Sequence, residues 1–581
     1  MKQQIAQVST VIAATLLFSL ASIAQQATPS PRPDEPSTGA ITGRVVGDNG
    51  QPLAGATIYL RSAAAMTSVR TTITDPEGNF QVNNLSASLY SVSAMSPAYT
   101  TEVRDPNTPP VYYRIGDSIQ LELVRGGVIT GTVSNSSGEP VVGIKVRAQL
   151  IRDAKGQRFP TFGSSERTTD DRGVYRIYGL YPGTYLVSAG GSNYQAFQSG
   201  PYDIDVPIYA PSSTRDNASE IAVRAGEETS VDIRYRGESG RRVSGTVKNV
   251  GAQGASIFLS PMKGVFSPSH SAFMQPEGRG FAFFGVPDGD YEIVAQQTVA
   301  ATPGMWGEIM LSEPRQISVR GADVSGLELT VQPLASVSGA VTLEPSKAAE
   351  CQNKRRPLFA ETAIDIVRNR KMDNASKFVL LNSLASSSQL DRNGNFNIRN
   401  LSDTQYAFVP RFFARYWYVQ SISLPSQFKA PVPRGAPTQR TADLARNWMS
   451  LRPGDRITGL TITLAEGAAS IRGKLSLAED AKPDANFKVF AVPAERDKAD
   501  DVLRFSASSL SADGSFALNN LAPGRYWVLA QTNADPELSP EKIKLPNAVD
   551  SRAKLRRAAE AGKIEVELKP CQNLTDYKLK L

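Results

Sequence analysis

The sequence predicts an all-β protein, a tandem array of five β-sandwich domains, from a repeated spacing and from its composition. An aromatic residue is followed five positions later by Leu or Val and ten positions later by Tyr. The five sets are Phe80/Leu85/Tyr90, Tyr175/Leu180/Tyr185, Phe281/Val286/Tyr291, Phe396/Leu401/Tyr406 and Phe516/Leu521/Tyr526. A fixed internal register indicates copies of one structural unit. The 45 glycines and 38 prolines, beside 41% hydrophobic residues, are typical of a turn-rich β protein.

Each unit has the pattern of two strands joined by a turn. The residue two positions after the leading aromatic is apolar in every copy, which is the period of a strand with one buried face. Turn residues such as Pro182-Gly183 and Pro523-Gly524 precede the Tyr, which opens a second alternating run. We expect the aromatic and Tyr side chains to fill the sandwich cores, because large rings dominate the energetics of β cores.

Further strands enclose each unit and set the domain boundaries. A Gly-containing strand opens each copy, as in Ile41-Thr-Gly43-Arg-Val45, and an alternating strand closes it, as in Ile119-Gln-Leu121-Glu-Leu123. The predicted domains are residues 39–125, 126–236, 241–333, 335–465 and 468–581. Because the connectors are short, we expect a semi-rigid array.

The fourth and fifth copies carry insertions between the Tyr strand and the closing strand. Residues 437–449 and 547–561 have the pattern of short helices, the second followed by Gly562 as a stop signal. Insertions in loops are where a protein's particular function is most often found.

The N-terminal residues predict export. Residues 1–24 form a signal peptide with Lys2, an apolar stretch from Val11 to Leu20 and a small-residue cleavage site at Ser22–Ala24. Residues 25–38 form a Pro-rich linker, and no later stretch is long and apolar enough for a transmembrane segment after signal cleavage. We therefore expect a secreted or periplasmic protein of the cell envelope.

The charge pattern favours no nucleic-acid partner. The formal net charge of +7 comes largely from local basic runs such as 354–356 and 552–557. In an exported chain without a recognition motif, such runs are expected to be solvated faces, and contact with anionic surface polymers is the alternative.

The motifs of the opening region resemble a known family. The pattern Gly-x-Val, Gly-x-Pro-(Leu/Val)-x-Gly, Asp-x-x-Gly-x-(Phe/Tyr) and Leu-x-Pro-Gly-x-Tyr is similar to the carboxypeptidase regulatory-like domain. The first two copies match it nearly in full, and the later three match through the opening strand and the aromatic unit. The resemblance implies transthyretin-like sandwiches, akin to Cna-B and carbohydrate-binding-like folds, that serve as accessory domains without catalysis.

No residue pattern predicts an active site, a cofactor or a metal centre. His270 is the single histidine and lies in a Ser/Pro-rich segment, so we expect an exposed loop residue and not a catalytic one. The turns at Asp75 and Asp391 place oxygen atoms at alternate positions, which leaves calcium as an alternative to plain hairpin turns. The resemblance to Cna-B domains leaves Lys–Asn isopeptide bonds open, with Lys248 and Lys474 near opening strands.

Two tryptophans are candidate platforms for stacking on a carbohydrate. Trp527 follows the core residue Tyr526 and should therefore point to the opposite face of its strand. Trp417 lies in the run 412–418, which holds more ring surface than one strand face can bury. Packing between neighbouring domains is the other use of these rings.

The two cysteines predict a disulfide. Cys351 and Cys571 are the only cysteines, and the chain is predicted to be exported to an oxidising compartment. The bond would join the fourth and fifth domains.

Together these observations favour an exported, non-enzymatic protein that acts as a structural or adhesive spacer, or as a binding module, at the cell envelope. The alternative is a carbohydrate-binding protein that uses aromatic platforms in domains four and five. An envelope polysaccharide or a surface protein is the expected kind of partner.

Overall fold

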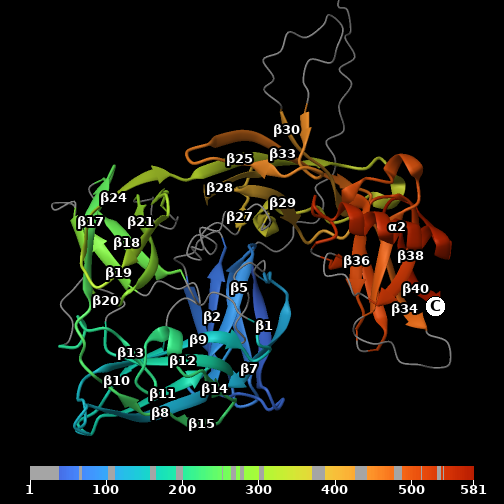
Figure 1. Cartoon of the computed structure of the whole chain (residues 1–581). Helices are drawn as coiled ribbons and strands as arrows, with labels where there is room; N and C mark the ends of the chain where they lie inside the picture. The colour runs from blue at the N-terminus through green and yellow to red at the C-terminus, as the bar shows by residue number, and fades with distance from the viewer. Residues whose placement is uncertain are drawn as a thin grey trace, which may run out of the picture. The chain divides into compact units, whose positions relative to one another are not determined.

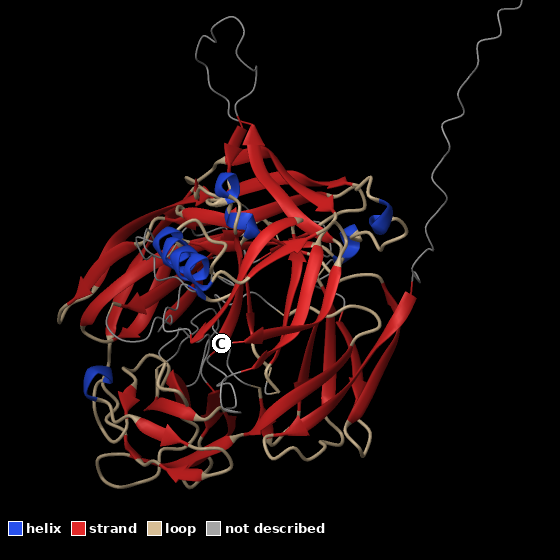
Figure 2. Ribbon diagram, turned by 90° about the vertical axis from the view of Figure 1, so that its right-hand side faces the viewer, coloured by secondary structure: helices blue, strands red, loops and turns tan. Residues whose placement is uncertain are grey.

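Strands dominate the computed structural model of this chain (Figures 1 and 2). It describes residues 38–63, 69–101, 111–157, 165–191, 201–251, 253–262, 270–274, 280–299, 307–369, 387–425, 441–476, 487–511, 513–532, 538–540 and 542–580. The predicted signal peptide and most of the predicted linker lie outside these residues. No helix among the described residues is long and apolar enough to cross a membrane.

Among the described residues, the sheets fall into five groups in chain order, each with its own hydrophobic cluster, and we name these groups modules one to five. In module one, one sheet has the order β4 (Asn79–Ser86), β1 (Thr38–Gly47), β7 (Ser118–Arg125), β6 (Tyr99–Thr100). The facing sheet has the order β3 (Val69–Ile73), β2 (Thr57–Ser62), β5 (Tyr90–Met95). The opening strand β1 pairs antiparallel with β4 and parallel with the closing strand β7.

Modules two and three repeat this plan. Module two contains β8 (Gly127–Ser134), β9 (Lys145–Asp153), β10 (Ser165–Thr168), β11 (Val174–Leu180), β12 (Gly183–Ala189), β13 (Ile208–Tyr209), β14 (Ile221–Val223), β15 (Glu228–Ser230), β16 (Ile233–Arg234) and the short helix η1 (Arg215–Asn217). Module three contains β17 (Arg241–Lys248), β18 (Ala255–Pro261), β19 (His270–Met274), β20 (Gly280–Val286), β21 (Gly289–Thr298), β22 (Ile309–Ser312), β23 (Arg315–Val319) and β24 (Val324–Pro333). In module three, β22 pairs with both β21 and β24 and so joins the two layers into one sheet.

Modules four and five keep the same pairings of the opening strand. Module four contains β25 (Ala335–Glu344), η2 (Ala349–Cys351), η3 (Phe359–Glu361), β26 (Ala363–Arg368), β27 (Ser387–Gln389), β28 (Asn395–Leu401), β29 (Gln405–Arg411), β30 (Trp417–Pro425), β31 (Thr441–Asp443), β32 (Met449–Ser450) and β33 (Arg456–Glu466). Module five contains β34 (Ala469–Ser476), β35 (Phe487–Pro493), η5 (Arg496–Lys498), η6 (Val502–Arg504), β36 (Ser506–Ser509), β37 (Ser515–Leu521), β38 (Gly524–Thr532), α2 (Val549–Gly562), β39 (Glu565–Leu568) and β40 (Asn573–Lys580).

The repeated aromatic and Tyr residues fill the cores, as the sequence predicts. All ten rings are buried. Each repeated Tyr also donates its hydroxyl to the main-chain carbonyl four residues earlier; the acceptors are Ser86, Tyr181, Pro287, Ser402 and Ala522. A buried hydroxyl needs such a partner, so the hydrogen bond explains why Tyr, and not Phe, closes the unit.

The glycine inside each opening strand is required by a close approach of the closing strand. A Cβ atom on Gly473 would lie 1.9 Å from the Tyr577 carbonyl oxygen, and one on Gly339 would lie 1.9 Å from that of Leu460. Gly43, Gly131 and Gly245 meet the carbonyl oxygens of their own closing segments in the same way. Since a carbonyl on a paired strand cannot move aside, a larger residue cannot occupy this position.

One of the two predicted helices forms. The second insertion forms α2, and its buried Leu555 and Ala559 pack with Phe490, Phe505 and Trp527 in a cluster separate from the main core of module five. The other prediction, a helix over 437–449, is wrong for residues 441–449, whereas 437–440 lie outside the described residues. Residues 441–443 instead form β31 along the edge of β30, and the Asp443 carboxylate accepts the Ala445 amide at 2.9 Å in the turn that follows.

Candidate functional site

The feature that links the modules is a bulge in the first strand of each repeated unit. In all five modules the pairing between this strand and the opening strand shifts by one residue. The residue just before the Leu or Val then has a positive φ: 57° at Asn84, 71° at Gly179, 66° at Gly285, 61° at Asn400 and 56° at Asn520. Gly and Asn are the residues that adopt this backbone conformation at least cost.

In modules four and five, the bulge Asn binds the main chain of the preceding module. The Asn400 side chain accepts the Ile309 amide at 2.8 Å and donates to the Gly307 carbonyl at 3.2 Å. The Asn520 side chain donates to the carbonyls of Ala414, at 2.8 Å, and Trp417, at 2.7 Å. Each Asn therefore hydrogen-bonds the main chain of the neighbouring sandwich through its side chain.

At the joint between modules two and three, the bulge residue is a glycine that makes the contact by its lack of a side chain. A Cβ atom on Gly285 would lie 2.7 Å and 2.8 Å from the carbonyl oxygens of Asp205 and Ile204. The joint between modules one and two contains a main-chain hydrogen bond from the Gly126 amide to the Ala98 carbonyl at 3.0 Å. In three of the four joints the bulge residue of one module meets the segment that follows the Tyr strand of the module before it, and at the first joint Gly126 makes that contact.

His270 belongs to the joint between modules two and three. The prediction that it is an exposed loop residue is wrong: it opens β19, is 2% exposed and packs edge-on against Phe283. Burial lowers the pKa of His270 to about 4, and the nearby positive charge of Arg147 in module two contributes to the lowering, whereas a hydrogen bond with the Gly285 main chain opposes it. The imidazole is thus neutral near pH 7 and acts as a packing residue.

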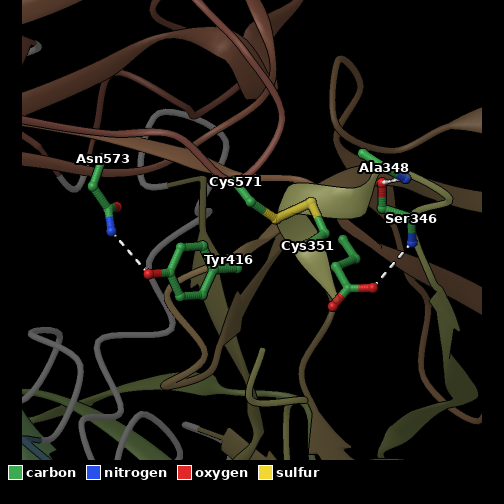
Figure 3. Close-up of a disulfide and its surroundings, with 7 residues drawn as sticks. Ser346, Ala348, Cys351, Tyr416, Cys571 and Asn573 are labelled. Carbon is green, nitrogen blue, oxygen red and sulfur yellow. Dashed lines mark hydrogen bonds between the residues drawn. A yellow bond between two sulfur atoms is a disulfide. The ribbon is translucent and has the colours of Figure 1, made fainter. Parts of the chain in front are cut away.

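The joint between modules four and five also carries a covalent bond. Cys351, in η2 of module four, and Cys571, just before β40, form the predicted disulfide, with their α-carbons 5.3 Å apart (Figure 3). The Cys571 amide donates to the Gly467 carbonyl at 2.9 Å. Beside the disulfide, the Asn573 side chain donates to the Tyr416 hydroxyl at 2.8 Å. One bond and several polar contacts therefore fix the same joint.

The prediction that Trp417 and Trp527 are open platforms for a carbohydrate is wrong, because both side chains are buried. Trp417 is 0% exposed in the core of module four, and Trp527 is 9% exposed. Trp527 does point away from Tyr526, but α2 covers that face, and the Arg556 guanidinium lies 5.0 Å from the indole ring centre. Neither ring can stack on a sugar, because stacking needs an open ring face.

The residues considered for calcium binding and for isopeptide bonds make local hydrogen bonds and ion pairs. The Asp75 carboxylate accepts the Asn79 amide at 2.7 Å, and the Asp391 carboxylate accepts that of Asn395 at 2.8 Å, so both close hairpin turns. Within the described part of the chain, no group of three or more acidic, His or Cys side chains could hold a metal ion. Lys248 and Lys474 form exposed ion pairs with Glu328, at 2.8 Å, and Asp513, at 3.3 Å.

Comparison with known families identifies the first two modules. The family model of the carboxypeptidase regulatory-like domain matches residues 40–116 and 128–236. The two matched ranges lie in modules one and two, which are similar to this domain. These domains carry the Gly-x-Pro turn, and in the structure Pro52 and Pro140 bridge to Val46 and Ser134 of their opening strands. No curated protein matches the chain.

Solved structures that align with part of this chain include two pilins. The Bacillus anthracis TIE protein aligns at 15% identity over 51% of each chain, with a TM-score of 0.14. GBS52, the minor pilin of Streptococcus agalactiae, aligns at 14% identity over 34% of this chain and 95% of its own, with a TM-score of 0.19. BcpA, the major pilin subunit of Bacillus cereus, aligns at 13% identity over 51% and 99%, with a TM-score of 0.14. These TM-scores are too low to support an inference about function.

Proposed function

We propose that this chain is an exported, non-enzymatic β-sandwich protein that serves as a structural or adhesive scaffold at the cell envelope. Each of the five modules is, in this proposal, one domain with the boundaries predicted from the sequence. The observation that carries the proposal is the chemistry of the joints. The Asn400 side chain binds the main chain of module three, and the Asn520 side chain binds that of module four, which is the chemistry expected of modules that support one another in an array.

The disulfide supports export. Bonds of this kind persist in oxidising compartments and are rare in the cytosol, where thiols are kept reduced. The Cys351–Cys571 bond joins two modules across a sequence separation of 220 residues, and both sulfur-bearing side chains are buried. A bond in that position stiffens a joint and serves no evident catalytic exchange, because buried disulfides are shielded from attacking thiols.

Fractionation of the source cells combined with thiol labelling tests the proposal. We expect the protein in the exported or envelope fraction, with no thiol reactive toward maleimide before reduction and two after reduction under denaturing conditions. A cytoplasmic protein with two reactive thiols would overturn both the export and the clamped joint. Hydrolytic activity of the purified protein toward envelope polymers would overturn the non-enzymatic role.

A further inference from the structure

Modules one and four, which are not neighbours in the chain, contact each other through charged side chains. Arg114 of module one lies with its guanidinium 3.6 Å from the carboxylate of Glu361 in η3 of module four. The Glu361 side chain is only 3% exposed, and Arg355 of its own module binds it at 2.8 Å. A buried carboxylate is stabilised when cations and hydrogen bonds surround it, so Arg114 completes a cluster that Arg355 begins.

Two cation–π contacts run in opposite directions across the same surface. The Arg114 guanidinium lies 5.3 Å from the ring centre of Phe413 in module four. In return, the Arg411 guanidinium of module four lies 5.4 Å from the ring centre of Tyr112 in module one. Arg411 is itself held at 2.6 Å by Asp365, whose side chain is 2% exposed. Each module thus presents both an arginine and an aromatic ring to the other.

A third contact extends the surface to another edge of module one. The Gln389 side chain of β27 donates to the Ser88 hydroxyl at 3.2 Å. Ser88 lies between β4 and β5, whereas Tyr112 and Arg114 precede β7, so two separate segments of module one take part. The complementary arginine, aromatic and carboxylate groups make the surface specific for one docking partner.

We propose that module one docks on module four through the ion cluster around Glu361, and that this contact is a releasable latch within a single chain. It rests on the proposed scaffold role and adds regulation to it. The joint between modules four and five is closed by a covalent disulfide, whereas the latch is held by an ion pair, two cation–π contacts and the Gln389–Ser88 hydrogen bond. The Arg114 and Arg411 side chains stay 26% and 28% exposed, so added salt weakens their contacts in part, whereas the disulfide does not depend on ionic strength.

Reversal of one charge at the latch tests the proposal in the oxidised full-length protein. Arg114→Glu places a carboxylate beside the buried Glu361, and Arg61→Glu makes the same charge change at an exposed position of module one as the matched control. We measure the radius of gyration by small-angle X-ray scattering, and hydrogen exchange of the amides of Glu361 and Tyr113. Far-UV circular dichroism establishes that both variants are folded.

With the latch, Arg114→Glu increases the radius of gyration and speeds exchange of these amides by at least about tenfold, since local opening exposes them, whereas Arg61→Glu changes neither. Salt added to the wild type reproduces the expansion. An unchanged radius and unchanged exchange in a folded Arg114→Glu protein would overturn the latch. A wild-type dimer that dissociates in Arg114→Glu would also overturn it, because the contact would then join two copies. The radius of gyration and the exchange rates do not depend on the cellular compartment of the protein. A negative result for the latch would therefore leave the scaffold proposal intact.

Discussion

The joint between modules four and five and the joint between modules two and three use the same place in the fold in opposite ways. At the first, Asn520 reaches two carbonyls of module four and a disulfide lies nearby. At the second, Gly285 has no side chain, and the carbonyls of Ile204 and Asp205 approach its α-carbon directly. Both residues adopt a left-handed backbone. One bulge geometry can therefore join two sandwiches either through a side chain that hydrogen-bonds the neighbouring main chain or through close contact of two main chains.

Of the changes that compare the two joints, removal of the disulfide should lower stability the most. Cys351→Ser opens a loop of 220 residues, and the chain-entropy model gives about 5 kcal/mol of lost stability for the concerted unfolding of modules four and five. When the oxidised protein is stretched from its ends, the residues between the cysteines cannot extend. The variant should gain about 3.3–3.6 Å of contour length for each of these residues. Equal contour lengths for variant and wild type would show that the bond does not form.

Acid should weaken the joint between modules two and three, because His270 lies there. Protonation of His270 should not affect the joint between modules four and five. The pKa of His270 is about 4 in the folded protein and about 6.5 when unfolded, so the unfolded chain binds more protons between these values. The free energy of unfolding of module three should fall by about 3 kcal/mol from pH 6.5 to pH 4, with no further loss from His270 below that. Chemical denaturation measures it. A His270→Gln protein with the same pH dependence would contradict this assignment.

A single methyl group should distinguish a bulge glycine in close contact from one in open space. Gly285→Ala adds a Cβ atom 2.7 Å from the Asp205 carbonyl oxygen, whereas a Cβ atom on Gly179 has nothing within 4 Å. Both variants strain a left-handed residue by about 1 kcal/mol, and only Gly285→Ala should lose about 1–2 kcal/mol more through overpacking. Thermal unfolding compares them. Equal losses would mean that the close approach does not hold module three to module two.

The amide of the bulge Asn should contribute the smallest effect. Asn520→Gly keeps the left-handed backbone accessible but leaves the Ala414 and Trp417 carbonyls without that donor, which should cost about 1–2 kcal/mol. Asn84→Gly makes the same change at an exposed bulge in module one and should be nearly neutral. Differential scanning calorimetry of the two proteins gives the difference. A loss at Asn84 as large as at Asn520 would assign the effect to the backbone.

Much of the fold follows from residue spacing, because two buried rings ten residues apart within each unit are a local pattern. The Tyr rings and the helix at 549–562 are of this kind. The joints were missed although a signal exists: the position before each repeated Leu or Val holds only Asn or Gly. His270 and Trp527 were misplaced for a different reason. His270 is buried against Phe283 of β20, and Trp527 is buried under α2, so the burial of both is set by tertiary packing and not by the local sequence.

The most direct test of fixed joints is hydrogen exchange at the Ile309 amide. This group donates to the Asn400 side chain of the next module at 2.8 Å, so its protection reports on one joint alone. If neighbouring modules hold one orientation, the amide should be protected in the wild type and exchange much faster in Asn400→Gly. Exchange in the wild type at the rate of an unstructured segment, or protection that survives in Asn400→Gly, would contradict the account of the joints.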